Sequence, residues 1–130
     1  MNQEWVIELP ISIPISAKHK FSLNLNIYRN ANFRILAAAK IAFAKKVTPL
    51  VRHLPKMKTI ALGYCLYPGS NHLTDISNVC CIVDKFFSDV LVSAGCIEDD
   101  NYKFVKEVNF MMGHVDKTNP RVEVTIHYLT

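Results

Sequence analysis

Residues Thr74 to Asn101 contain the clearest pattern in the chain, an amphipathic helix predicted over Ile76–Ala94. Asp75 stands directly before this helix in the position of an N-cap, and Gly95 follows its end, where a left-handed residue often closes a helix. At 100° per residue one arc of the helix is apolar. This arc consists of Val79, Val83, Phe86, Phe87 and Val90. A helix with such an arc has to bury it, so the rest of the chain must supply a sheet or a second helix.

The remaining segments supply both. Alternation of apolar residues predicts four strands, at Glu4–Leu9, Met57–Tyr67, Asn101–Met112 and Arg121–Tyr128. The prolines after the first strand place it at an edge of the sheet. Small residues on one face of the second strand, at Ala61, Gly63 and Cys65, suggest that a helix packs closely there.

A second helix is predicted over Ala31–Thr48, capped by Asn30 or Asn32 and ended or kinked by Pro49. Ser16–Asn30 has no helical stripe and is expected to be an extended basic loop. The predicted fold class is α/β (α+β), a single domain over residues 1–130. It has a mixed sheet of about four strands with two main helices packed on it, in the order β-α-β-α-β-β.

Composition narrows the class of protein. Half of the 130 residues are hydrophobic and a fifth are charged, as in a folded domain. No apolar run approaches the ~20 residues of a membrane span, and no signal peptide is evident, so we expect a cytoplasmic protein without a membrane partner. The four cysteines form no C-x-x-C pair and are expected to be buried thiols. No glycine-rich phosphate loop occurs, so no nucleotide cofactor is expected.

Charge is unevenly distributed along the chain. Between Pro10 and Asp75 there is no Asp or Glu, although most of the fifteen Lys and Arg residues fall there. A segment with this imbalance carries a positive field, for which a polyanion such as DNA is the natural partner. The candidate DNA-binding residues are Lys18, Lys20, Arg29, Arg34 and Lys40. The alternative is that these cations form an ordinary solvated surface.

Acidic residues mark the two ends of the predicted Ile76–Ala94 helix. Asp75 precedes it, and Asp99 and Asp100 follow it in a run of three acids. If the chain after the helix folds back, these carboxylates meet and suit Mg²⁺, which takes one or two carboxylates and keeps several waters. The alternatives are an N-cap at Asp75, a polar turn at Asp99–Asp100, and an i,i+4 surface pair between Lys85 and Asp89.

Several segments together resemble one family. They are similar to segments of the RusA-type Holliday-junction resolvases. In the second half of the chain these segments are DISN, KFFSDVLVSAG, IEDDNY and NPRVEVTI, and in the first half they are WVIELP and LNLNIYRNANFR. The similarity is to the version carried by phages and prophages, and it covers nearly the whole chain. Its most specific part is the spacing from Asp75 through Lys85 to Asp99 and Asp100.

The resemblance implies a homodimer in the cytoplasm of a bacterial host cell. It also implies an endodeoxyribonuclease of DNA recombination and repair, which cuts branched, four-way DNA with Mg²⁺, or with Mn²⁺ as a substitute. By position, the metal ligands would be Asp75 and Asp100, with Asp99 beside them and Asn78 as a neutral oxygen ligand. Lys85 corresponds to a functionally important lysine, which would make Asp75, Asp100, Lys85 and Asp99 the catalytic group.

One departure bears on activity. The family has Asp-x-Asp-Asn at the helix start, and this chain has Asp75-Ile76-Ser77-Asn78. Ser77 thus replaces a carboxylate, which weakens Mg²⁺ binding or moves the task to another acid such as Asp84. Four additional residues precede Lys85, about one helical turn. Two other functions stay open: a branched-DNA-binding protein that is weakly active or inactive, and a protein-interaction module.

Overall fold

The four strands of the main sheet and the two long helices follow one another in the predicted order, and the computed structural model describes residues 3–130. The elements are β1 (Gln3–Leu9), β2 (Ser12–Pro14), β3 (Lys20–Ser22), α1 (Leu25–Asn30), α2 (Phe33–Val51), β4 (Ile60–Tyr67), α3 (Ile76–Ser93), β5 (Val105–Met112) and β6 (Arg121–Tyr128). The main sheet has the strand order β1-β6-β4-β5, and β2 and β3 form a separate hairpin. Only β4 and β5 run parallel; the β1–β6 and β4–β6 pairs are antiparallel. The mixed four-strand sheet with two main helices is confirmed, and β1 is an edge strand as predicted.

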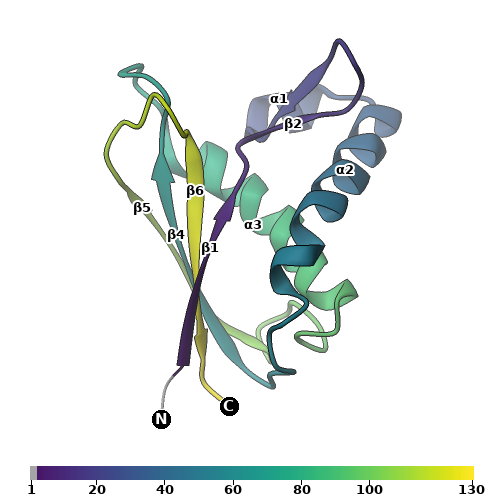
Figure 1. Cartoon of the computed structure of the whole chain (residues 1–130), viewed down its shortest axis with the longest axis vertical. Helices are drawn as coiled ribbons and strands as arrows, with labels where there is room; N and C mark the ends of the chain where they lie inside the picture. The colour runs from purple at the N-terminus through teal and green to yellow at the C-terminus, as the bar shows by residue number, and fades with distance from the viewer. Residues whose placement is uncertain (1–2) are drawn as a thin grey trace.

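Both helices lie on one side of the sheet (Figure 1). Alternate residues of β4, from Ile60 to Leu66, are buried, as are Val122, Val124 and Ile126 of β6. The intervening residues Ala61, Gly63 and Cys65 are only partly covered. The prediction that a helix packs on these small residues is therefore wrong: α3 covers the face with the large side chains, where it gains more apolar contact.

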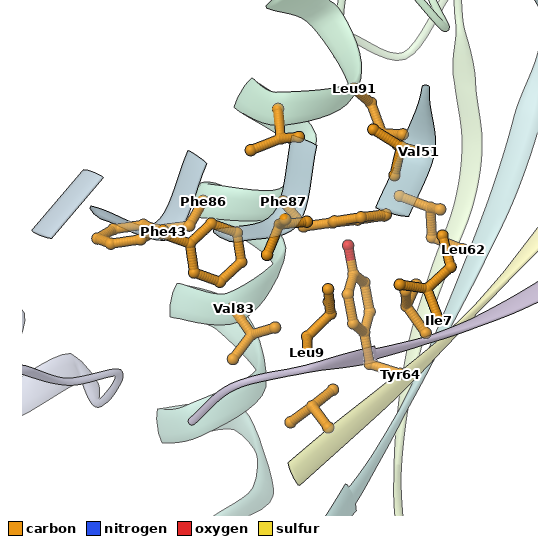
Figure 2. Close-up of a cluster of buried hydrophobic side chains, with 14 of the residues drawn as sticks. Ile7, Leu9, Phe43, Val51, Leu62, Tyr64, Val83, Phe86, Phe87 and Leu91 are labelled. Atoms are coloured by element: carbon orange, nitrogen blue, oxygen red, sulfur yellow. The ribbon is translucent and has the colours of Figure 1, made fainter. Parts of the chain in front are cut away.

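Phe86 of α3 joins three other elements in the core. Its ring lies 6.1 Å from that of Phe21 in β3, 6.4 Å from that of Tyr28 in α1 and 5.5 Å from that of Phe43 in α2, centroid to centroid. Figure 2 shows Phe43 beside Phe86, with Phe87 on the sheet side. The predicted apolar arc of α3 is buried throughout.

The segment Ser16–Asn30 is not the extended loop that we expected. Its first part forms β3, and its last part forms α1, whose start is fixed by the Asn24 side chain accepting a hydrogen bond from the Asn26 N–H at 2.9 Å. No residue of α1 is buried, so this helix has no apolar stripe that periodicity could detect. Phe21 and Leu23, in contrast, are buried in the core.

Three boundaries also differ from the prediction. Helix α2 continues through Pro49 to Val51, because Pro49 is exposed in the last turn while Val51 is buried. β4 begins at Ile60 rather than Met57. β5 begins at Val105, because the Phe104 and Val105 N–H groups both donate to the Asn101 carbonyl and form a turn. At the helix starts, Asn32 and Asp75 are caps as expected, and Gly95 has the predicted positive φ of 78°.

All four cysteines are free, with Cys80 and Cys96 buried and Cys65 and Cys81 partly buried. This agrees with the expectation of thiols without disulfides. Neither α2 nor any other helix within residues 3–130 has the length and apolar character that a bilayer span requires.

Replacing Phe86 tests its role in the core. Phe86→Ala removes contacts to three aromatic rings at once, and we expect a loss of about 3–5 kcal/mol in the free energy of unfolding, measured by urea titration. Phe86→Leu keeps most of the buried volume and should lose less than half as much. Equal losses for the two variants would contradict the expectation that buried volume at Phe86 provides most of this stability.

Candidate functional site

A cavity of about 440 Å³ opens between α1, α3 and β5. Two carboxylates and one ammonium group, from Asp84, Asp100 and Lys85, line it together with the Tyr28 ring and the Ser88 hydroxyl. Asp84, Lys85 and Ser88 come from successive turns of α3, whereas Asp100 comes from the segment that folds back after Gly95. We call this group the carboxylate cavity.

The Asp84 carboxylate is fixed by hydrogen bonds from two buried side chains. Its Oδ1 accepts hydrogen bonds from the Tyr64 hydroxyl at 2.6 Å and from the Ser88 hydroxyl at 3.2 Å. Tyr64 stands on β4 among buried apolar side chains, with its hydroxyl directed away from the sheet (Figure 2). Burial raises the pKa of the Asp84 carboxyl, the two hydrogen bonds partly oppose this, and the Asp100 charge raises it further.

The electrostatics of the carboxylate cavity therefore favour a bound cation. A desolvated carboxylate beside a second carboxylate is costly when ionised, and a cation placed between them lowers that cost. The Tyr64 pKa is also raised well above its usual value, mainly by burial and then by the Asp84 charge. Tyr64 thus stays protonated and acts as a permanent donor to Asp84.

Lys85 does not form the surface pair that the sequence left open. Within residues 3–130 its ammonium group makes no ion pair with Asp89 or any other acid. Its Nζ lies 5.9 Å from the centre of the Tyr28 ring, a cation–π distance. Lys85 is exposed and available to an anionic ligand at the mouth of the carboxylate cavity.

Asp75 and Asp99 use their carboxylates in local turns. Asp75 Oδ1 accepts hydrogen bonds from the Ser77 N–H at 3.2 Å and from the Ser77 hydroxyl at 2.9 Å, as an N-cap does. Asp99 accepts one from the Asp100 N–H at 2.8 Å and one from the Asn101 amide at 3.1 Å. Asp75 is therefore the helix N-cap, and Asp99 belongs to a polar turn, as the two local alternatives in the sequence analysis expected.

The structure brings together only part of the predicted group. Asp100 and Lys85 share the carboxylate cavity with Asp84, but Asp84 lies nine positions after Asp75, about 13 Å along the helix axis. Asn78 lies within the first turn of α3, near Asp75. Across residues 3–130, no three His, Cys, Asp or Glu side chains are grouped so that they could hold a metal ion.

The candidate DNA-binding residues all lie outside the main sheet. Lys18 and Lys20 belong to the hairpin, Arg29 to α1, and Arg34 and Lys40 to α2; all five are exposed. None of them forms an ion pair in the described part of the chain. The uncovered face of the sheet carries four acids, Glu4, Glu8, Glu107 and Glu123, and Arg121 of the same face pairs with Glu8 and Glu123. The candidate DNA-binding cations therefore lie away from this more acidic face.

Tyr64, Ser88 and Tyr28 were missed by sequence reasoning. One signal for Tyr64 was present, since its polar head stands between Leu62 and Leu66 on the apolar face of its predicted strand. Asp84 lies next to the apolar arc of α3, which places it toward the sheet rather than toward solvent. No protein-family model matches this chain, and no curated protein is significantly similar to it. A function therefore has to be argued from these residues.

Removing the Tyr64 hydroxyl tests the support of Asp84. Tyr64→Phe removes a hydrogen bond that favours ionised Asp84, so the pKa of Asp84 should rise further. A carboxyl whose pKa is higher in the folded than in the unfolded state weakens the fold as the pH rises through that value. We expect Tyr64→Phe to lose about 1–3 kcal/mol of unfolding free energy at neutral pH. This loss should become smaller as the pH falls, because Asp84 is then protonated.

The measurement is urea unfolding at several pH values between acid and neutral. Tyr102→Phe, at an exposed tyrosine, is the matched control and should change nothing. A loss for Tyr64→Phe that is independent of pH would contradict the coupling to Asp84.

Proposed function

We propose that this protein is a structure-selective endodeoxyribonuclease that cuts branched, four-way DNA by metal-assisted phosphodiester hydrolysis, in recombination or repair. The observation that carries the proposal is the grouping of Asp84, Asp100 and Lys85 in one cavity, together with exposed basic residues that form no ion pair within residues 3–130. The resemblance to the RusA-type resolvases supports the same chemistry.

The donor atoms of the carboxylate cavity fit a hard divalent cation. Asp100 accepts no hydrogen bond from any residue in 3–130, and Asp84 uses only its Oδ1. Mg²⁺ needs one or two carboxylates and fills its other positions with water, and Mn²⁺ favours the same oxygen ligands. When bound, such an ion supplies an activated water and offsets charge on the scissile phosphate.

The other residues would hold the DNA in place. Lys85, at the mouth of the cavity, would stabilise charge that develops on the phosphate. Lys18, Lys20, Arg29, Arg34 and Lys40 would contact the backbone, which makes binding steeply dependent on salt. A homodimer would match its two-fold axis to that of a four-way junction and so place two cuts symmetrically.

Removing either carboxylate tests the site. We expect Asp84→Asn and Asp100→Asn each to reduce the cleavage rate of a labelled four-way junction about a hundredfold or more, because metal catalysis supplies several kcal/mol. Asp89→Asn, at an exposed acid of the same helix, is the control. Cleavage by both cavity variants at the rate of the control would overturn the proposal for this cavity.

Asp75→Asn separates the cavity from the site at the helix start that the resemblance implies. Asn caps a helix as well as Asp does, so the melting temperature should be unchanged. If the site is the carboxylate cavity, cleavage persists within a few-fold. If Asp75 is a metal ligand, cleavage is lost in a fully folded protein, and the site then lies at the start of α3.

A second candidate function is a branched-DNA-binding protein with little or no catalysis. The observation favouring it is that Ser77 donates to Asp75 where the family has a second carboxylate, and that no group of three ligands exists in residues 3–130. Binding of the junction without any nicking, in both Mg²⁺ and Mn²⁺, would establish this function in place of the nuclease.

A further inference from the structure

A second groove lies on the other side of α1, between this helix, the β2–β3 hairpin and the start of α2. Its volume is about 490 Å³. Leu25 and Tyr28 of α1 line the carboxylate cavity, whereas Asn26, Ile27 and Asn30 line this groove. The short helix is thus a wall between two binding spaces, and we call the second one the α1 groove.

The floor of the α1 groove is aliphatic and open to solvent. Ile27 is 46% exposed and Ile35 is 36% exposed, which is unusual for two isoleucines that lie together. Phe21, at the back of the groove, is covered. The floor can therefore accept a flat apolar surface, but it has no accessible aromatic ring.

Two side-chain amides border this floor. Asn26 and Asn30 lie one turn apart on α1, and the Asn30 amide nitrogen donates to the Asn26 carbonyl at 2.9 Å. The Asn30 Oδ1 and the whole Asn26 side chain make no hydrogen bond within residues 3–130. An amide presents a donor and an acceptor side by side, which is the pattern that matches the edge of a nucleobase.

The charge around the α1 groove has one sign. Lys20 lines it, and no acid is among its lining residues. Its occupant should therefore combine a flat, partly apolar body with a negative charge. An unpaired nucleotide has both properties.

We propose that the α1 groove receives an unstacked base of branched DNA, which rests on the proposed function in DNA cleavage. Taking a base out of a regular duplex costs a few kcal/mol, but the cost is much smaller where pairing is already interrupted. A groove that requires a free base therefore binds a branch point better than it binds duplex. It supplies the structure selectivity that the carboxylate cavity, which contacts only backbone, lacks.

The position of the groove fits this role. A helix with its side chains is about 10 Å wide, so a base in the α1 groove lies about that far from the carboxylates. That distance equals about three nucleotides of stacked strand. The scissile phosphate and the unstacked base can therefore belong to one strand that passes over α1.

The test compares two exposed isoleucines. Ile27→Gln removes the apolar floor without adding charge, and Ile41→Gln makes the same change on α2, where Ile41 is 69% exposed and lies outside the groove. Affinity is measured for a four-way junction and for a duplex of the same sequence. Ile27→Gln should weaken junction binding about tenfold, comparable with the loss of one buried aliphatic contact, and leave duplex binding unchanged.

A fluorescent base reports the unstacking directly. With 2-aminopurine at the branch point, wild-type protein and Ile41→Gln should raise the emission, because an aliphatic floor does not quench it, and Ile27→Gln should not. If wild type binds and cuts the junction but the two variants behave alike, the inference is overturned and the nuclease proposal stands. If wild type does not bind the junction, both fail. A third outcome would also overturn the inference. If wild type binds an acidic amphipathic peptide more tightly than the junction, and this peptide displaces the junction from the groove, the groove belongs to a protein partner.

Discussion

The packing of Phe86 against three other rings holds the three helices and the β2–β3 hairpin together. The hairpin, α1 and α2 each contribute one aromatic side chain to this contact. Helix α1 has no buried residue of its own, so its position depends on Tyr28 lying against Phe86. Both the carboxylate cavity and the α1 groove use α1 as a wall. The shape of the two binding spaces thus depends on a core contact that touches no ligand in either.

The Tyr64–Asp84 hydrogen bond connects the core to the cavity. Fixing a carboxylate from a buried strand orients it well, but it also leaves the ionised form partly desolvated. Such an arrangement lowers stability in the empty protein and gives some of that free energy back when a cation binds. Carboxylates that are partly desolvated in this way are concentrated at functional sites. This distinguishes Asp84 from the other acid of α3, Asp89.

Periodicity was a good guide wherever one face of an element is buried and the other is not. β6 and α3 follow their predicted periodicity, since Val122 to Ile126 and the arc around Phe86 decide how each element packs. It failed for α1, which has no buried stripe, and for the open face of β4, where small residues such as Gly63 are not covered by a helix. For the site, the sequence correctly brought Asp100 back to the helix. It could not show that the returning chain reaches Asp84 rather than Asp75, because that depends on the length of α3.

The separation of charge between the two sides of the molecule affects how it meets a partner. Acids on the bare sheet face and cations on the hairpin, α1 and α2 give the protein an electric dipole that runs between the sheet and the helices (Figure 1). In the field of a polyanion such a molecule is turned during diffusion, before any contact forms. For the proposed DNA partner, productive encounters would become more frequent, and the acidic face would be kept away from nucleic acid. The bare sheet would then act at long range without touching the DNA, and added salt would slow association before it weakened the complex.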